Sequence, residues 1–412
     1  MNLFTPLTLP NGAVLPNRLG KAAMEENMAD ADHAPSDELI RLYGAWARGG
    51  VGLMLTGNVM VDGRAMTGPG GVVLESDSHL DRFRRWAQVA RSGGAQVWMQ
   101  INHPGRQMPA ALGQRTWAPS AVALDMGKFS DRFAVPREMA LADIVEVTSR
   151  FVRSAQLAEQ AGFTGVQIHA AHGYLLSQFL SPLVNQRRDE WGGSIENRAR
   201  LLLGIVRAVR QAVSPQFVVA VKLNSADFQR GGFSPDDAKH VVQALSGLAD
   251  LVELSGGSYE APAMQGQARD GRTLAREAYF LSFAQDIAAV AQMPLMVTGG
   301  IRRAAVATQV IDSGVAVVGM GTALAINPNL PNDWRAGLPS APALPPINWN
   351  NKMLASMANM ALVKFQLRRL SRGRKPNPKV WPLRALVLDQ LGALRGARRY
   401  RQWVAQREAH PA

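Results

Sequence analysis

The chain has 412 residues, and 47% of them are hydrophobic, which is enough to bury a large core and suits an elaborated α/β barrel. It contains no cysteine, which excludes disulfides, cysteine-bound zinc, iron–sulfur clusters and thiol nucleophiles. The formal net charge of +13 makes nucleic acids and membrane surfaces candidate partners.

The N-terminal segment predicts a hairpin rather than a secretory signal. It has no basic start, and Pro6, Pro10 and Gly12 interrupt it. Residues 7–18 predict two short strands that turn at Asn11 and Gly12. Because no apolar run reaches the roughly 18 residues that a membrane span needs, we expect a cytoplasmic protein.

Short β-branched runs alternate with longer helical patterns, which is typical of repeated βα units. Eight runs predict strands: Leu19–Ala22, Val51–Thr56, Gln96–Asn102, Gly165–His169, Val218–Leu223, Leu251–Leu254, Pro294–Thr298 and Ala316–Gly319. Helices are predicted over 138–161, 194–213, 234–248 and 275–291. The pattern favours a (β/α)8 TIM barrel over residues 1–334. A doubly wound sheet is the alternative, but no complete G-x-G-x-x-G follows a strand.

Two further segments are predicted outside the βα repeat. The longest insertion, 103–137, follows the third strand and is expected over the barrel mouth. Residues 335–412 form a basic extension, which holds 15 of the 45 Lys and Arg and two of the 32 Asp and Glu, so that 30 of each remain in the barrel. Helical stretches are expected over 351–371 and 383–407. In the first, Met353, Met357, Met360 and Leu367 recur at helical spacing.

Polar residues gather where the fourth strand ends. His169, His172 and Tyr174 lie within HAAHGY, at the carboxyl end where barrel enzymes carry their reactive groups. Neutral imidazoles can donate hydrogen bonds to a carbonyl oxygen, and a tyrosine hydroxyl can deliver a proton. The set fits reduction of an activated C=C bond. The alternatives are structural histidines, or a metal-dependent barrel lyase or hydrolase in which the two histidines bind a metal with Glu25 or Glu26.

Other strand ends indicate an anionic, heteroaromatic ligand. Gly299-Gly300 and Gly319/Gly321 each precede a helix after strands seven and eight, where barrels commonly bind phosphate, although tight βα turns are the alternative. Lys222 interrupts an apolar strand and is expected to point into the barrel mouth and meet an anion. Gln100 can present both a donor and an acceptor to a heteroaromatic edge.

Several motifs together resemble the Old Yellow Enzyme family of FMN-dependent NAD(P)H:flavin oxidoreductases. The longest is GFTGVQIHAAHGYLLSQFLSPLVNQRRDEWGGSIENRARL, residues 162–201. The N-terminal LFTPLTLPNGAVLPNRLGKAAM also fits, and four shorter motifs occur in the family's order: QINHPGR (100–106), VAVKLNSADF (219–228), VTGGI (297–301) and VVGMG (317–321). The resemblance covers residues 1 to about 334.

The resemblance implies an FMN-binding TIM barrel that takes hydride from NADH or NADPH and passes it to an electron-poor alkene, the small-molecule substrate. His169 and His172 then hold the substrate carbonyl, and Tyr174 is the proton donor. The implied FMN-binding residues are Ala23, Met24, Glu25, Asn58, Gln100, Lys222, Gly300, Gly321 and Thr322. Flavin-dependent amine or N-methyl dehydrogenation on the same barrel is an alternative.

The chain departs from the family pattern at several flavin positions. Lys222 stands where the family usually has arginine, Glu25 where relatives often have Cys or Thr, and Ala23 where they often have Pro. Thr322 replaces a frequent phosphate-binding arginine, for which Arg302 or Arg303 is the expected substitute. These changes leave the substrate open.

The resemblance and the composition also set expectations about partners. Without cysteine, the chain resembles the barrel alone rather than larger members that append an iron–sulfur cluster and a second nucleotide-binding domain. A homo-oligomer is expected. For the basic extension, packing on the barrel or on a neighbouring protomer is favoured over contact with anionic lipid or RNA through Trp381, Tyr400 and Trp403.

Overall fold

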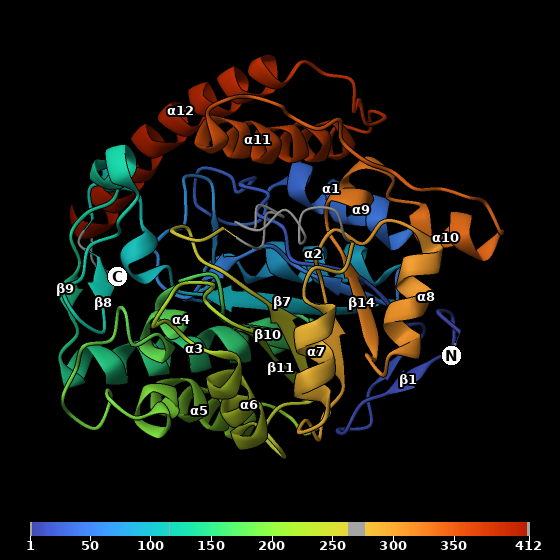
Figure 1. The fold of residues 1–412 in the computed structure, drawn as a ribbon. Helices are drawn as coiled ribbons and strands as arrows, with labels where there is room; N and C mark the ends of the chain where they lie inside the picture. Colours follow the sequence, from blue (N-terminus) through green and yellow to red (C-terminus); the bar gives the residue numbers. More distant parts are fainter. Residues whose placement is uncertain (1, 115, 263–276, 410–412) are drawn as a thin grey trace.

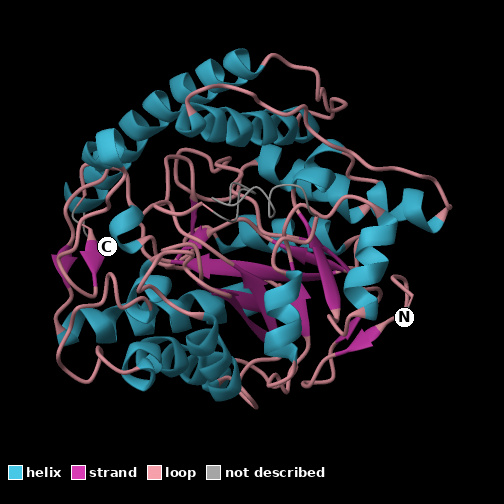
Figure 2. Ribbon diagram, in the orientation of Figure 1, coloured by secondary structure: helices cyan, strands magenta, loops and turns pink. Residues whose placement is uncertain are grey.

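The protein forms a closed barrel of parallel strands surrounded by helices (Figure 1 and Figure 2). The computed structural model describes residues 2–114, 116–262 and 277–409. Within them, eight strands pair side by side, and the last closes on the first, so the doubly wound alternative is wrong. In barrel order the strands are β3 (Leu19–Lys21), β4 (Leu53–Leu55), β7 (Gln96–Asn102), β10 (Gly165–Ala170), β11 (Val218–Asn224), β12 (Leu251–Ser255), β13 (Leu295–Val297) and β14 (Val317–Met320).

All eight predicted strands are confirmed, with ends that differ by at most two residues. The N-terminal hairpin is confirmed as β1 (Leu7–Thr8) and β2 (Val14–Leu15), joined through Gly12 at a φ of +86°. The helices between the barrel strands are α1 (Asp37–Ala47), α2 (Leu80–Arg91), α3 (Leu141–Gln160), α4 (Leu175–Leu180), α5 (Ile195–Ala212), α6 (Pro235–Ala244), α7 (Leu281–Ala288) and α8 (Ala304–Asp312). They are followed by α9 (Thr322–Ile326) and α10 (Leu330–Arg335).

Local signals placed some helices well and missed several short elements. The capping box of α6 forms as its sequence predicts, with Ser234 accepting from the Asp237 backbone and Pro235 in the first position. The helix predicted over 275–291 is shorter, and residues 275 and 276 lie outside the described residues. The unpredicted strands are β5 (Val59–Met60), β6 (Val72–Val73), β8 (Trp117–Ala118) and β9 (Arg137–Glu138). The 3-10 helices are η1 (Gly105–Gln107), η2 (Ala110–Leu112) and η3 (Gly127–Arg132).

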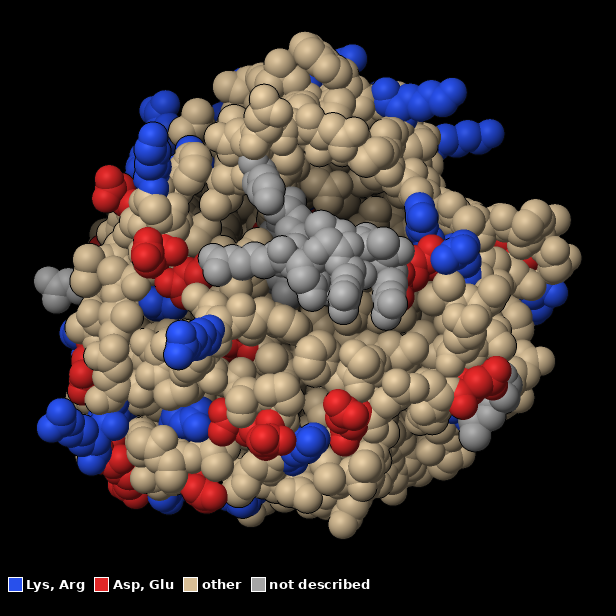
Figure 3. Space-filling view, viewed as in Figure 1, with Lys and Arg blue, Asp and Glu red and all other residues tan. Residues whose placement is uncertain are grey.

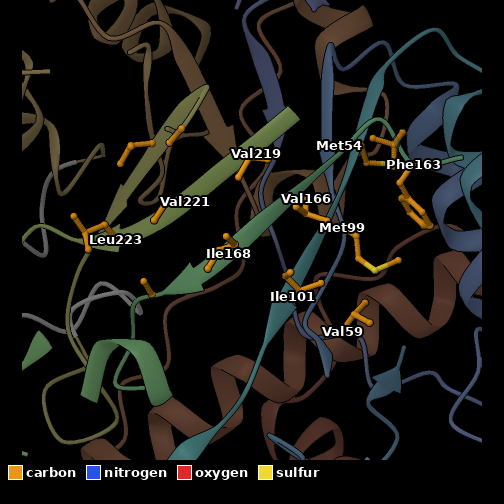
Figure 4. Close-up of a cluster of buried hydrophobic side chains, with 14 of the residues drawn as sticks. Met54, Val59, Met99, Ile101, Phe163, Val166, Ile168, Val219, Val221 and Leu223 are labelled. Carbon is orange, nitrogen blue, oxygen red and sulfur yellow. The ribbon is translucent and has the colours of Figure 1, made fainter. Parts of the chain in front are cut away.

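The two-residue alternation of the strands separates an outer apolar layer from a mixed interior. Figure 4 shows the outward set on three neighbouring strands, including Ile101 of β7, Ile168 of β10 and Val221 of β11, which pack in the main core cluster. A second cluster, with Trp98, Ala220 and others, fills part of the barrel interior. Alternation therefore directs the polar residues of the same strands inward.

The basic extension packs on the barrel. Its two helices, α11 (Lys352–Ser371) and α12 (Pro382–Ala409), lie against each other across one end of the barrel, and α11 also contacts α1 and α9 (Figure 1). Tyr400 is fully buried, donates to the carbonyl oxygen of Gly63 at 3.0 Å, and contacts His33 edge to face. Trp403 also contacts His33, whereas Trp381 is 65% exposed. Two of the three aromatic residues that suggested lipid or RNA binding thus hold the extension on the barrel.

No helix in the described part of the chain is long and apolar enough to cross a membrane.

His103, just beyond β7, makes the stability of the barrel sensitive to acid. It is 3% exposed, stacks on Trp117, and accepts from the Gly105 backbone at 3.1 Å. Burial lowers its pKa to about 4. In the unfolded chain this histidine is protonated below about pH 6.5, whereas in the folded chain it stays neutral down to about pH 4. The free energy of unfolding therefore falls as the pH is lowered between these two values.

We expect His103 alone to lower the free energy of unfolding by about 2 kcal/mol when the pH is changed from 7 to 5. Urea titrations at both values measure it. His103→Asn can still accept from Gly105 but does not titrate, so its stability should fall less over the same interval. An equal fall in both proteins contradicts the assignment.

Candidate functional site

A chain of polar side chains crosses the barrel interior at its carboxyl end. The Gln100 amide on β7 donates to Gln167 of β10 at 2.7 Å, and Gln167 donates in turn to Glu253 of β12 at 2.7 Å. The Lys222 ammonium on β11 pairs with the other oxygen of Glu253 at 2.8 Å. The strand registers place Gln167 opposite Gln100. They place Lys222 between His169 on one neighbouring strand and Glu253 on the other.

Lys222 meets an anion inside the barrel, as its position in an apolar strand predicts, but the anion is a protein carboxylate. Lys222 is 4% exposed and Glu253 is fully buried. Sequence reasoning missed Glu253 and Gln167, although both interrupt apolar strands in the way that singled out Lys222. The same signal could have found them.

The three predicted catalytic residues lie together. The ring of His169 is 5.1 Å from that of His172 and 4.9 Å from that of Tyr174, centroid to centroid. His172 has a φ of +62°, which hydrogen bonds from two neighbouring segments stabilise: its backbone N–H donates to Asn224 of β11, and its carbonyl accepts from Gln107 of η1. Its Nε2 lies 2.8 Å from the hydroxyl of Ser255.

The electrostatics keep both imidazoles neutral. Burial, with His172 and Lys222 nearby, holds the pKa of His169 well below its ordinary value, and burial with Lys222 does the same to the pKa of His172. The Ala171 backbone N–H donates to Nδ1 of His169 at 3.2 Å, so the ring proton of His169 is on Nε2. His169 is therefore a neutral donor.

Tyr174 keeps its proton for a related reason. Burial and the nearby Tyr259 raise its pKa well above the ordinary value. Its hydroxyl lies 3.1 Å from that of Tyr259 and also hydrogen-bonds to the side chain of Asn58, one of the predicted FMN-binding residues. A protonated phenol close to neutral imidazoles can both donate a hydrogen bond and transfer a proton.

The segment after β3 brings three predicted residues to the same end of the barrel. Ala23 packs beside the interior cluster, and Met24 lies against Gly321, whose added Cβ would be 3.7 Å from it. Glu25 accepts from Thr67 at 2.8 Å and pairs with Lys364 of the extension at 3.3 Å. Burial alone would raise the pKa of Glu25, but the ammonium of Lys364 and the Thr67 hydroxyl hold it below its ordinary value.

Glu26 lies apart from this group. It pairs with the fully buried Lys21 at 3.2 Å and accepts from the hydroxyl of Tyr43 at 2.7 Å, on the outer side of β3 where α1 packs. A metal site that uses Glu26 with the two histidines is therefore not assembled. In the ranges that the structure describes, no group of three or more His, Asp or Glu is arranged to hold a metal.

The predicted phosphate loops end β13 and β14. Gly300 has a φ of +73°, which favours glycine, and the exposed Thr322 begins α9 directly after Gly321. Neither α8 nor α9 has a side chain that caps its first turn. The loop already binds one anionic side chain of the protein, because Glu277 accepts from the Arg302 backbone N–H at 3.3 Å.

Glu277 also engages the two arginines expected to replace the missing phosphate ligand. It pairs with Arg302 at 3.0 Å and with Arg303 at 2.8 Å. Both arginines lie beside the loop, but their partner is a carboxylate that sequence reasoning did not identify.

Comparisons with known proteins agree with this geometry. The family described as NADH:flavin oxidoreductase / NADH oxidase matches residues 2–341. The chain is 40% identical over 351 residues to the NADH-dependent flavin oxidoreductase iliE of Neonectria sp. (strain DH2), covering 79% of this chain and 46% of that protein. It is 37% identical over 348 residues to the iliE of Hypocrea jecorina (strain QM6a), covering 79% and 87%.

Solved structures show the same barrel. The old yellow enzyme homologue from Zymomonas mobilis superimposes with a TM-score of 0.71 at 26% identity, covering 83% of this chain and 94% of that one. A 2-naphthoyl-CoA reductase complex gives 0.75 at 26% identity, covering 82% and 52%. The chain thus spans about half the length of that reductase and of the Neonectria relative.

The barrel, its polar interior and these matches define a flavin-dependent oxidoreductase of the TIM-barrel class. The chain belongs to the NADH:flavin oxidoreductase / NADH oxidase family. The resemblance first recognised in its motifs is therefore confirmed, and the family implies flavin and NADH as the redox cofactors.

Proposed function

We propose that the protein is an FMN-dependent ene-reductase that uses NADH to reduce the activated C=C bond of an α,β-unsaturated carbonyl compound. The observation that carries the proposal is the group formed by His169, His172 and Tyr174. The neutral imidazole of His169 lies 5.1 Å from that of His172 and 4.9 Å from the protonated phenol of Tyr174, centroid to centroid, at the carboxyl end of the barrel.

The residues present fit FMN. Gln100 and Lys222 supply polar hydrogen-bonding groups on the barrel interior, as the pyrimidine edge of a flavin requires. Ala23, Met24, Glu25 and Asn58 would border the ring system, and Gly300, Gly321 and Thr322 would hold the phosphate. The anion that already accepts from the Arg302 backbone supports this last assignment, because the loop is built to donate to negative charge.

Bound FMN would accept a hydride from NADH and later supply it to one carbon of the substrate's C=C bond. The protein's own contribution is electrophilic. His169, with its proton on Nε2, and His172 donate to the carbonyl oxygen and so draw electrons away from the alkene. Tyr174 delivers the proton to the other carbon, which completes addition of one hydride and one proton.

Lys222 contributes less positive charge to the flavin site than its sequence position implies. Glu253 lies 2.8 Å away and is fully buried, so the pair is close to neutral. We propose that Lys222 acts mainly as a hydrogen-bond donor at the flavin pyrimidine, with its position set by Glu253.

The purified protein tests the proposal directly. It is expected to show the visible absorption of oxidised flavin, to bleach on anaerobic addition of NADH, and to regain colour with cyclohex-2-enone. Colourless protein that takes up no FMN contradicts the cofactor assignment. Protein that is reduced by a secondary amine but not reoxidised by the enone instead supports the amine dehydrogenase alternative.

A further inference from the structure

A cavity of about 820 Å³ lies between the barrel mouth and the C-terminal extension. Its floor includes Glu25, Asn27, Thr67 and Tyr259, all from loops at the carboxyl end of the barrel. Because the Tyr259 hydroxyl is 3.1 Å from that of Tyr174, the cavity opens directly beside the proposed proton donor. Figure 3 shows a recess beneath the helices of the extension.

The extension supplies one wall of this cavity from two helical faces. On α11 the lining residues are Met353, Ser356, Met357, Met360, Lys364 and Arg368, and on α12 they are Asp389, Gly392, Ala393, Arg395, Gly396 and Arg399. The three- and four-residue spacing puts each set on one side of its helix. The three methionines that recur at helical spacing in α11 therefore line this cavity, whereas Leu367 of the same stretch is fully buried.

Small residues let α12 approach the barrel closely. A Cβ added to Gly396 would lie 2.8 Å from the Cβ of Pro69, which belongs to the loop after β5. The helix therefore packs closely on the loops at the barrel mouth. Arg395 and Arg399, one turn apart, lie in the cavity wall on either side of this contact. The other helix, α11, is held at the barrel mouth by the ion pair between Lys364 and Glu25.

The charges of the cavity wall do not balance. Four of its five acidic residues have a basic partner: Glu25 pairs with Lys364, Asp30 with Arg82, Glu260 with Arg106, and Asp389 with Arg368. Three lining arginines, Arg132, Arg395 and Arg399, pair with no carboxylate among the described residues. The fifth acid, Asp125, accepts from the Gly127 backbone. The cavity therefore presents excess positive charge to a ligand.

We propose that the extension is the dinucleotide-binding wall of the catalytic pocket, and that Arg395 and Arg399 bind the pyrophosphate of NADH. The proposal rests on the barrel mouth being the hydride-transfer site. NADH must bring its nicotinamide to that mouth, and its remaining length then extends outward past the rim. Guanidinium groups bind phosphate oxygens in bidentate geometry, and a cavity of this volume exceeds what a small cyclic enone fills.

Experiment can distinguish NADH from two alternatives at Arg395 and Arg399. The arginines face solvent in part, so they could remain hydrated and contact no ligand. They could also bind an anionic group of the electron acceptor. The dinucleotide is favoured because the family uses NADH, which carries two phosphate charges, whereas an α,β-unsaturated ketone carries none.

The test uses the flavin-loaded full chain and the double variant Arg395→Gln/Arg399→Gln. The dissociation constant for NADH, from stopped-flow bleaching of the flavin, is expected to rise at least about tenfold. Bleaching by 1-benzyl-1,4-dihydronicotinamide, which has the hydride but no phosphate, should be unchanged. Calorimetric binding of tetrahydroNAD, which transfers no hydride, should weaken by the same factor.

Arg398→Gln is the matched control, because Arg398 is exposed on the same helix but lies outside the cavity wall. It should change none of these values. Unchanged NADH binding in the double variant overturns the proposal, and so does a loss confined to an anionic acceptor, tested with 4-(3-oxobut-1-enyl)benzoate against its methyl ester. If NADH bleaches the flavin but no alkene reoxidises it, the ene-reductase proposal fails while this one stands.

Discussion

The variant Lys222→Met is expected to lower the free energy of unfolding by about 3–5 kcal/mol. Lys222 is 4% exposed, and its ammonium is 2.8 Å from Glu253, which is fully buried. Removing the lysine leaves a carboxylate inside the barrel with only the Gln167 amide as a partner. The cost is the desolvation of that unpaired buried charge rather than the lost attraction.

A matched double variant separates the charge from the packing. Lys222→Met/Glu253→Gln removes both charges and keeps an oxygen that accepts from Gln167, so most of the lost stability should return. Urea unfolding of the three proteins at neutral pH provides the measurement. A loss below about 1 kcal/mol in Lys222→Met would show that the pair is solvated and contributes little.

In Tyr174→Phe, reoxidation of the reduced flavin by cyclohex-2-enone is expected to slow by about 10²–10⁴-fold. The ring of Tyr174 packs 4.9 Å from that of His169, and phenylalanine retains that contact, so only the proton donor is removed. Bleaching by NADH involves no proton from Tyr174 and should remain within about twofold of the parent. Stopped-flow measurement of the two half-reactions separates these effects.

Tyr259 provides the control for this variant. Its hydroxyl is 3.1 Å from that of Tyr174, and burial raises its pKa as well, so it is a second protonated phenol near the same position. Tyr259→Phe should slow reoxidation far less if Tyr174 is the donor. If Tyr259→Phe has the larger effect, the proton comes from Tyr259, and the role assigned from the family motif is wrong.

Much of the barrel could be predicted because its signals are local. Each strand is a short run of apolar and β-branched residues, and its ends could be predicted to within two residues. The grouping of His169, His172 and Tyr174 follows from their adjacency in one segment. The two-residue strands β5, β6, β8 and β9 could not be predicted, since such short runs have no periodicity.

The polar chain inside the barrel was predicted only in part. Gln100 and Lys222 were identified, but Gln167 and Glu253 were not, and these two connect them. Which polar side chains share the interior depends on the register of four neighbouring strands. A shift of one residue would turn each side chain to the other face of the sheet.

The sequence by itself determined the fold class, the residues at the strand ends and the family, because repeated βα periodicity and an extended motif are properties of contiguous segments. It also located the excess positive charge in residues 335–412. Only the tertiary structure decided what that charge does. Lys364 meets Glu25, Tyr400 meets Gly63, and Arg395 and Arg399 line the cavity at the barrel mouth. These contacts join opposite ends of the chain, and their energy depends on packing between helices and loops that no local pattern encodes.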